Sequence, residues 1–499
     1  MESRLTASRG GSGPTTRGSA LLARLLTPRG IAVDGVVVLL VLGALMRLVF
    51  MTAWRPAFMG YPDSIVYIWM ADGPLFDDPI HAVGYPLFLR VLHDVTTNLS
   101  VTIAFQHVLG LASGLMIYLI VRRAGGGPAW LGLVPMAVVV LNGAEMFLEH
   151  SPLSEAPYIF VELVALYAAI RAIDSSRAVA WGAFVGVLAA AGAVLRVVGL
   201  PLIPIFLAWL LLAPTVPWRR RIQVAGAAAA CTALILGWFV IAQHDQTGYT
   251  GLTPRAGGWN LYARVAPFAD CSRFTPPKGT QVLCETTPES KRPGVEQYDY
   301  DADVSPAVQA FGNPFNSSQE SNRKVSAFAR AVVVHQPLDY LEAVGKGMFG
   351  YTQPLPPHGT NLKFGSSFEW FFHVVLFDAD VMERARRNAL PYYRSDSSYH
   401  VRDSQMDFLF GYERATRVQG VLMVVLLLLS LLAPFVTHGR TRRVVVLITV
   451  FTWVSLVVPV ATHWWDARTT VPVLGPLVAA AALGGWGAAL VVRRALASR

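Results

Sequence analysis

Long apolar runs separated by short polar segments make up most of this chain. Each run is about 16 to 22 residues long, which is close to the length that an α-helix needs to cross a bilayer. The pattern therefore predicts about ten transmembrane helices. They are expected at 33–52, 101–121, 129–147, 156–173, 179–195, 198–213, 224–242, 419–436, 444–461 and 470–491. Only the tight sequence RVVGLP separates the fifth run from the sixth, so these two runs are alternatively one re-entrant unit.

One long polar segment, 243–417, interrupts this series. Residues 326–351 and 369–390 carry apolar residues at intervals of three and four, which predicts amphipathic helices. Residues 305–324 are rich in Ser, Asn, Pro and Gly and are expected to form a flexible loop. The segment is therefore predicted to be a mixed, mostly helical insertion that folds back over the membrane.

The composition supports a membrane protein. Hydrophobic residues make up 54% of the 499 residues and charged residues only 15%, against about 25% charged in a soluble domain. The net charge of +9 is consistent with nucleic-acid binding, but the sequence shows no zinc-ligand spacing and no basic helix. Arginine in short cytoplasmic loops explains the charge, and we expect no nucleic-acid partner. The fold class is a polytopic α-helical membrane protein.

Arginine also predicts the orientation. It is frequent in the N-terminal tail and in every second loop, at 122–127, 171–177, 218–221, 438–443 and 493–499. By the positive-inside rule, both termini are then cytoplasmic in a multi-pass protein of the cell membrane. The predicted parts are a disordered cytoplasmic tail (1–30), an N-terminal transmembrane module (31–242) with its first external loop (53–100), an extracytoplasmic domain (243–417), C-terminal transmembrane helices (418–492) and a cytoplasmic tail (493–499).

Acids and histidines gather on the opposite, external side in this orientation. They are Asp63, Asp77, Asp78, His81, Glu149, His150, Glu155, His463 and Asp466. A transporter tends to hold such residues near the bilayer midplane on broken helices. Their position along one boundary instead favours chemistry at the membrane surface.

Asp63 follows the first apolar run, within FMGYPDSIVYIWM. A partly desolvated carboxylate there is expected to have a raised pKa and to serve as a general base. The alternative is a surface aspartate at the start of an interfacial helix.

Three short motifs resemble the GT-C superfamily of membrane glycosyltransferases, which includes protein O-mannosyltransferases, the lipid A aminoarabinose transferase and mycobacterial arabinofuranosyltransferases. They are GYPDSIVYIWM with HAVGYPLFLRVLH, then EHSPLSEAPYIF, and WWDARTTVPVLGPL. The resemblance covers 33–200 well and 444–490 loosely. It implies a polyprenyl-phosphate sugar donor and Asp63 as the catalytic acid of the first external loop. Ser64 stands where many relatives have a second acid, and Thr469 where they have an aromatic residue. We therefore expect no metal site.

The resemblance also implies site roles. The donor phosphate gains negative charge as it leaves, and cations near it stabilise the transition state. Arg196 and Arg468 are the main candidates for this role, and Arg55 and Arg264 are weaker ones; interfacial arginines that reach lipid headgroups are the alternative. Candidates for binding the sugar or the acceptor are Glu149, His150, Glu155, His81, Tyr85 and His463. Helix capping is the alternative for Glu155, and membrane anchoring for His463.

The cysteines fit this orientation. Cys271 and Cys284 lie in the external segment, where an oxidising compartment favours a disulfide between them. Two free thiols or a weak metal pair are the alternatives. Cys231 lies in an apolar run and is expected to be an inert buried thiol.

Together these observations predict an enzyme that transfers a sugar from a polyprenyl-phosphate donor to a glycan or protein hydroxyl outside the membrane. A cell-envelope arabinan or mannan is a plausible product, because the Arg/Ala/Val/Leu-rich, Lys-poor composition suggests a GC-rich bacterium such as an actinobacterium. No cofactor is expected, because the donor arrives through the lipid. A flippase for lipid-linked saccharides and a noncatalytic envelope-assembly protein are the alternatives.

Overall fold

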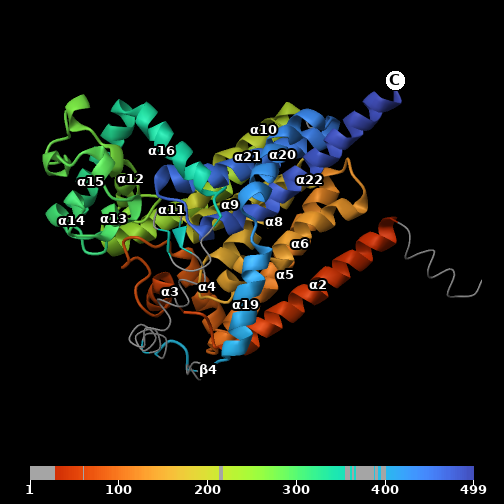
Figure 1. The fold of residues 1–499 in the computed structure, drawn as a ribbon, viewed down its shortest axis with the longest axis horizontal. Helices are drawn as coiled ribbons and strands as arrows, with labels where there is room; N and C mark the ends of the chain where they lie inside the picture. Colours follow the sequence, from red (N-terminus) through yellow and green to blue (C-terminus); the bar gives the residue numbers. More distant parts are fainter. Residues whose placement is uncertain are drawn as a thin grey trace, which may run out of the picture.

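The computed structural model describes residues 28–59, 61–212, 217–354, 360–361, 365–366, 387, 391–394 and 400–498. A long helical bundle carries a smaller helical domain at one end (Figure 1). The main helices are α2 (Pro28–Ala53), α3 (Pro62–Asp72), α4 (Gly84–His93), α5 (Leu99–Ala124), α6 (Leu133–Leu141), α7 (Gly143–Glu149), α8 (Glu155–Ala172), α9 (Ala178–Leu195), α10 (Leu202–Leu212), α11 (Trp218–Thr247), α12 (Gly257–Val265), α13 (Val295–Tyr300), α14 (Pro306–Phe311), α15 (Gln319–His335), α16 (Pro337–Gly350), α19 (Asp403–Thr416), α20 (Gly420–Val436), α21 (Gly439–Thr462) and α22 (Ala467–Ala497).

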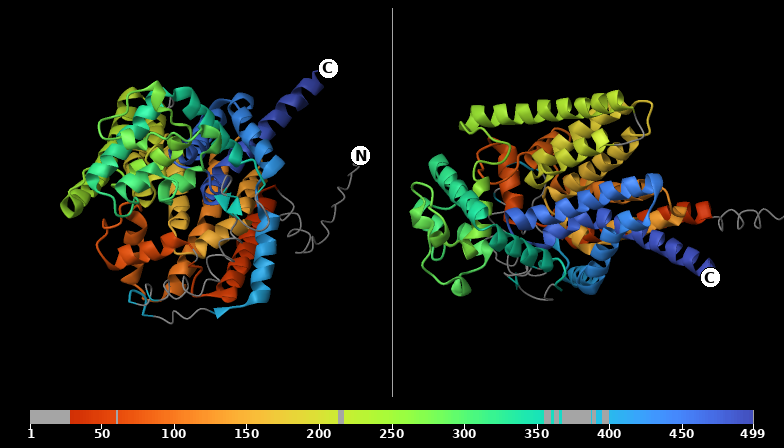
Figure 2. Two further views of the ribbon diagram at one scale, coloured as in Figure 1. Left: turned by 60° about the vertical axis from the view of Figure 1, so that its left-hand side comes forward. Right: turned by 90° about the horizontal axis from the view of Figure 1, so that it is seen from above.

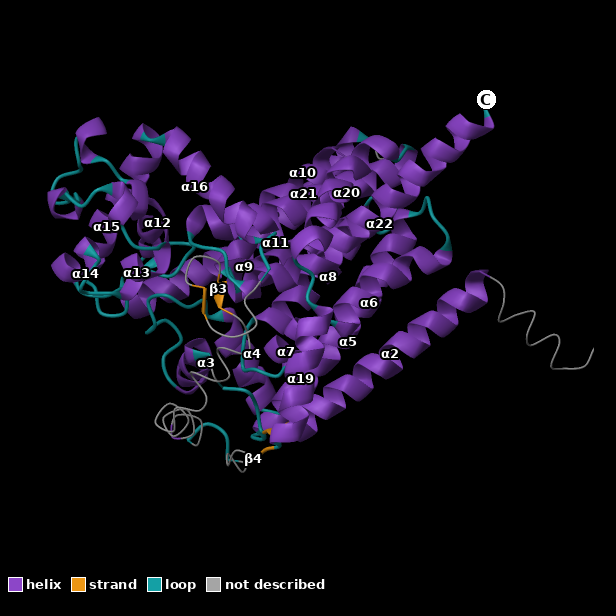
Figure 3. Cartoon of the chain, in the orientation of Figure 1, coloured by secondary structure: helices purple, strands orange, loops and turns teal. Residues whose placement is uncertain are grey.

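Strands are very short in the described part of the chain (Figure 3). β1 (Trp54–Arg55) pairs antiparallel with β4 (His400–Val401), and β2 (Thr360–Asn361) pairs with β3 (Gly365–Ser366). The first pair joins the end of α2 to the chain just before α19. It therefore ties the start of the predicted first external loop to a segment more than three hundred residues later in the sequence.

Each of the ten predicted transmembrane segments is helical in the structure. By length and composition, six helices of the described chain can cross a membrane, or up to eight if each bent pair is one span. The bent pairs are α6 with α7, at 52°, and α19 with α20, at 44°. The six are α2, α5, α9, α11, α21 and α22. The structure therefore shows a polytopic helical protein, while the predicted number of ten is not confirmed.

Two predicted spans differ from an ordinary membrane helix for clear reasons. α8 carries the charged residues Glu155, Glu162 and Arg171, which are costly in a bilayer unless protein surrounds them. α10 has only 11 residues and follows a break at Arg196, whose backbone is extended. This break separates the fifth predicted segment from the sixth at RVVGLP.

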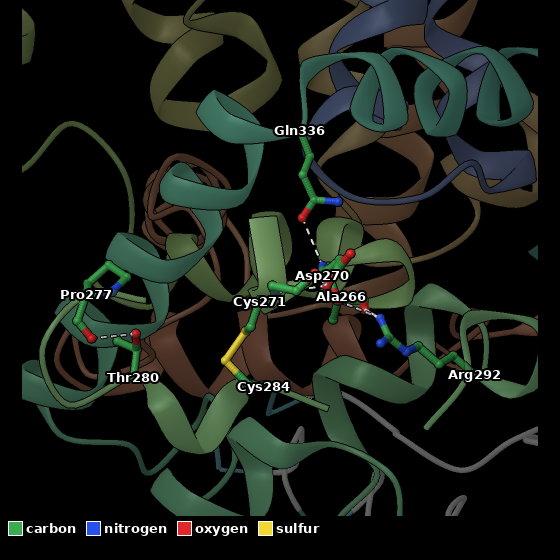
Figure 4. Close-up of a disulfide and its surroundings, with 10 residues drawn as sticks. Ala266, Asp270, Cys271, Pro277, Thr280, Cys284, Arg292 and Gln336 are labelled. Carbon is green, nitrogen blue, oxygen red and sulfur yellow. Dashed lines mark hydrogen bonds between the residues drawn. A yellow bond between two sulfur atoms is a disulfide. The ribbon is translucent and has the colours of Figure 1, made fainter. Parts of the chain in front are cut away.

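The domain formed by α12–α16 has its own apolar core. Trp259, Tyr262, Tyr298 and Phe328 are buried at its centre. The predicted Cys271–Cys284 disulfide is present and links two short 3₁₀ turns at its edge (Figure 4). Cys231, in α11, is free and half-buried.

Two details of this domain differ from the predictions. The expected flexible loop at 305–324 instead contains α14 and the start of α15, because Ser305 and Ser318 cap these two helices through their side-chain oxygens. The helical pattern at 326–351 is divided between α15 and α16, and the break falls at Gln336, just before Pro337. The helix predicted at 369–390 and the tail at 1–27 lie outside the described residues.

The beginning of α2 and the end of α22 lie at the same end of the bundle, away from the α12–α16 domain (Figure 2). α3 and α4, from the first external loop, lie beside that domain (Figure 1). The site described next is formed between the 53–100 segment and the ends of α8, α9 and α22.

Candidate active site

Asp63 lies in the first turn of α3. Pro62 begins this helix, and its fixed φ angle suits the first helical position. A carboxylate in the first turn also interacts favourably with the positive end of the helix dipole. The N-cap residue is Tyr61, which makes no side-chain capping bond. The Asp63 side chain is 28% exposed and is therefore open to a ligand.

Arg468, in the first turn of α22, connects two acids of the site. Its Nη1 donates to Asp63 Oδ2 at 2.8 Å, and its Nε and Nη2 donate to Glu155 Oε1 at 2.9 and 2.7 Å. The guanidinium also lies 4.7 Å from the centre of the Tyr61 ring. Asp466 caps α22 by accepting a hydrogen bond from the backbone N–H of Arg468. The cap therefore fixes the position of the backbone from which the Arg468 side chain extends.

Glu155 is shared by two arginines. It is the first residue of α8 and is fully buried, and its Oε1 also lies 2.5 Å from Arg196 Nη1. Arg196 Nη1 donates to Ser154 Oγ as well, at 3.2 Å. The second oxygen, Oε2 of Glu155, has no hydrogen-bond partner in the described part of the chain. One buried carboxylate thus holds two cationic side chains close together.

A close backbone approach helps to place Arg196. A Cβ at Gly84, the first residue of α4, would lie 2.5 Å from the backbone nitrogen of Leu195. Only glycine leaves room for α4 to pack so tightly on the end of α9. This explains the glycine in the GYPLF element and fixes the chain just before Arg196.

His81 completes the site. Its Nε2 lies 3.5 Å from Asp63 Oδ1, and its Nδ1 lies 2.9 Å from Asp78 Oδ1. Asp78 Oδ1 also accepts the backbone N–H groups of Ile80 and His81, which fixes this turn. We call the five residues Asp63, His81, Glu155, Arg196 and Arg468 the Arg468 cluster.

The electrostatics of the cluster correct one prediction. Burial raises the pKa of Asp63, but the charge of Arg468 and the contact with His81 outweigh this effect and hold the pKa well below its ordinary value. The expected raised pKa is therefore wrong for this state of the protein. Burial lowers the pKa of His81, whereas its contacts with Asp63 and Asp78 raise it to about 9. Asp63 is thus ionised and His81 protonated at neutral pH.

Glu149 and His150 belong to a different group of side chains. Glu149 accepts from Arg47 Nη2 at 2.6 Å, and its Oε2 lies 2.7 Å from His107 Nδ1. His107 Nε2 in turn lies 3.1 Å from His150 Nδ1. We call these four residues the inner network; all four are buried. The structure therefore does not bring Glu149 or His150 together with Asp63, although both were predicted to bind sugar or acceptor.

Tyr85 lies between the inner network and the cluster. Its hydroxyl donates to Gln106, whose amide donates to the backbone oxygens of Glu149 and Ser151. The Tyr85 ring lies 5.0 Å from the Tyr67 ring, which lies 5.3 Å from the ring of His81. Tyr85 is fully buried, so it supports the site from behind.

Three other predicted residues lie apart from the cluster. Arg55 is exposed, and its Nε donates to the backbone oxygen of Met51. Arg264 is buried in α12 and donates to the backbone oxygen of Ala343 in α16. His463 Nε2 lies 2.6 Å from Asp299 Oδ2, so this histidine links the membrane bundle to α13.

Sequence analysis missed several residues that shape the site. Tyr61, Tyr67 and Ser154 contact the cluster, but aromatic and serine residues are too common for their positions to indicate this. Arg47 offered a clearer signal, because a charged residue inside an apolar run requires a partner. The described residues contain no group of three or more His, Cys, Asp or Glu side chains that could hold a metal ion.

No family model matches this sequence, and no curated protein matches it. Among solved structures, the chain is similar to the Saccharomyces cerevisiae protein O-mannosyltransferase complex bound to the sugar donor. That match has 14% sequence identity and a TM-score of 0.35, and it covers 50% of this chain and 38% of the yeast chain.

The chain is also similar to the Archaeoglobus fulgidus oligosaccharyltransferase. The form in complex with an inhibitory peptide and a dolichol-phosphate matches at 12% identity and a TM-score of 0.43, over 92% of this chain and 51% of the archaeal chain. The form tethered to an acceptor peptide matches at 11% identity and a TM-score of 0.45, over 93% and 50%. This chain therefore spans about half the length of the archaeal enzyme and less of the yeast one.

Proposed function

We propose that this protein transfers a sugar from a polyprenyl-phosphate donor to an acceptor hydroxyl, with the reaction centred on Asp63. The observation that carries the proposal is the Arg468 cluster itself. In it, the partly exposed carboxylate of Asp63 lies 2.8 Å from Arg468. Arg196 is paired to Glu155, the buried glutamate that also binds Arg468. A base beside fixed cations is what displacement of a phosphate leaving group requires.

In the proposed step, the acceptor oxygen forms a bond to C1 of the sugar while the bond from C1 to the phosphate oxygen breaks. The acceptor proton passes to Asp63, and the donor leaves as a polyprenyl phosphate monoester. The low pKa of Asp63 keeps this side chain ionised, so it can accept the proton, but it also makes the carboxylate a weaker base. Arg468 orients that carboxylate through its hydrogen bond to Oδ2.

Arg196 is the better candidate for holding the phosphate. Both of the polar contacts described for its side chain use Nη1. We propose that Nε and Nη2 bind the phosphate. Arg196 also lines a cavity of about 30 Å³ whose other walls are mostly apolar, among them Ile159, Leu163 and Phe451. At about the size of one water molecule, this cavity would have to widen to admit a lipid phosphate beside Arg196.

The acceptor is proposed to approach from the α12–α16 domain. This domain contacts the first external loop through Arg255, which donates to the backbone oxygen of Asp77, and it contacts the end of α21 through Asp299 and His463. The proposed acceptor is a cell-envelope glycan, an arabinan or a mannan, or a protein hydroxyl. In the predicted orientation the reaction occurs outside the cell membrane.

The experiment is a transfer assay with the full chain in lipid nanodiscs. Polyprenyl-phosphate mannose and polyprenyl-phosphate arabinofuranose are each supplied as labelled donors with short mannan or arabinan acceptors. Release of polyprenyl phosphate that depends on acceptor and is abolished by Asp63→Asn supports the proposal. Release that continues at the original rate in Asp63→Asn removes Asp63 from the proposed role.

A further inference from the structure

An apolar groove lies between α10 and α21, with a volume of about 660 Å³. Its α10 wall is formed by one helix face, on which Ile205, Ala208, Trp209 and Leu212 recur at intervals of three and four. Its α21 wall is formed by Val446, Leu447 and Val450 in the same way. Two apolar helix faces therefore lie opposite each other without filling the space between them.

The groove has positive charge at one end. Arg442 and Arg443, in the first turns of α21, also line it. Arg442 is exposed, and Arg443 is half-buried with an Nε that has no hydrogen-bond partner in the described part of the chain. A buried N–H group without a partner costs free energy. A ligand with hydrogen-bond acceptors at this end would remove that cost.

This groove is separate from the Arg468 cluster. α21 runs from Gly439 to Thr462, and the cluster lies beyond its other end. At 1.5 Å per residue, about 30 Å of helix separates Arg443 from that end. The rings of Phe206 and Phe451, with centroids 6.0 Å apart, bring α10 and α21 into contact on the side toward the cluster.

We propose that the groove binds one anionic glycerophospholipid, with its phosphate on Arg442 and Arg443 and one acyl chain along the apolar walls. Arginine pairs strongly with phosphate oxygens, and the apolar walls exclude a ligand that is charged along its length. The volume lies within the range of about 300–1,000 Å³ that is typical of ligand pockets. In the predicted orientation, the lipid comes from the cytoplasmic leaflet.

The exposed residues of the groove indicate how the lipid enters. Leu212, Val446 and Val450 are exposed on the outer surface of the bundle, where the bilayer surrounds the protein. The groove therefore meets the membrane laterally. A lipid that is abundant in the surrounding bilayer fills such a site by mass action. This argument favours a bulk phospholipid over a scarce polyprenyl phosphate, and it does not depend on the proposed sugar transfer.

The test measures the lipid that stays bound to the purified full chain. The protein is reconstituted in nanodiscs with equal amounts of phosphatidylglycerol and phosphatidylcholine and then exchanged into detergent, and the bound lipid is counted by mass spectrometry. We expect about one phosphatidylglycerol per chain, in at least tenfold excess over phosphatidylcholine. The double variant R442Q/R443Q should lose this excess, and R493Q/R494Q, an exposed arginine pair near the end of α22, should keep it.

A second variant keeps the charge and removes the space. Ala208 is exposed and lines the groove, so A208F should fill it without disturbing a buried contact. We expect A208F also to lose the retained phosphatidylglycerol, which keeps the proposal testable if R442Q/R443Q fails to fold. Three outcomes would overturn the proposal: no excess of phosphatidylglycerol in the unaltered protein, no change in either folded variant, or retention of polyprenyl phosphate instead when that lipid is added.

Discussion

Arg468 Nη1 lies 2.8 Å from Asp63 Oδ2, although 405 residues separate the two in sequence. Asp63 lies in the first turn of α3, and Arg468 lies in the first turn of α22. Their contact brings together two of the three motifs that resemble membrane glycosyltransferases. The predictions below test what this contact and its neighbours do.

Replacing Asp63 by Asn should lower sugar transfer by at least about 100-fold, because an amide cannot accept the acceptor proton. The fold should persist, since the Asp63 side chain is partly exposed. Initial rates of polyprenyl phosphate release measure the effect. Asp72→Asn is the matched control, because Asp72 is an exposed acid at the other end of α3, and its rate should stay within twofold of the original.

Replacing Arg468 by Lys should lower the transfer rate by about 100-fold, because one ammonium group cannot reproduce three hydrogen bonds to two carboxylates. The loss should appear in kcat more than in KM if Arg468 acts by orienting Asp63. Arg55→Lys should leave the rate unchanged, because the described contact of the Arg55 side chain is to the backbone oxygen of Met51, at the end of α2. Equal losses in both variants would contradict the separation of Arg55 from the site.

His81 should make stability depend on pH. Its folded-state pKa of about 9 lies above its ordinary value of 6.5. The contribution of the protonated ring is therefore complete below about pH 6.5 and is lost as the pH rises through 9. The difference in Tm between the original protein and His81→Gln should shrink over that interval. A difference that stays constant from pH 6 to pH 10 would show that the contacts of His81 with Asp63 and Asp78 are not ionic.

Replacing Glu155 by Gln should lower the free energy of unfolding by about 3 kcal/mol, because it removes the buried anion that two largely buried arginines share. Thermal unfolding in detergent measures this effect. Glu342→Gln is the control: Glu342 and Lys346 are 65% and 75% exposed, and such a pair contributes at most about 1 kcal/mol. If both variants unfold at the same temperature, Glu155 does not hold the cluster together.

Removal of the Cys271–Cys284 disulfide should destabilise the α12–α16 domain by about 3 kcal/mol, because it frees a loop of 13 residues in the unfolded chain. Proteolysis within 266–292 should become faster in the C271S/C284S variant. Cys231→Ser, in α11, should leave that rate unchanged. A proteolysis rate that is the same in all three proteins would show that the disulfide adds nothing to the stability of this domain.

Each apolar run that the sequence predicted to cross the membrane is helical, because apolar periodicity and length follow from the bilayer, but only six to eight of the helices are long and apolar enough to span it. It also placed Asp63, Glu155, Arg196 and Arg468 at one boundary, and the structure brings these four side chains into contact. What it could not show was the partner of each group. The direction of the pKa shift of Asp63 depends on Arg468, and a charge so distant in sequence is invisible in a local motif.

Glu149 and His150 illustrate the same limit. Their spacing near the start of α8 suggested a shared role with Glu155, yet they lie at the end of α7, where they contact Arg47 and His107. A turn of a few residues decides which side of a helix bundle an acid faces. Composition and spacing hold no information about that choice. The position of Arg47 within an apolar run, in contrast, did indicate that this arginine has an acidic partner.

The origin of Asp63 and Arg468 at opposite ends of the chain has a consequence for biosynthesis. A ribosome completes the first external loop long before it reaches codon 468, so a nascent chain holds the carboxylate without the arginine that orients it. Insertion of α22 is then the event that completes the Arg468 cluster. In the proposed reaction, a partly made protein could not consume a lipid-linked sugar before translation has passed that point.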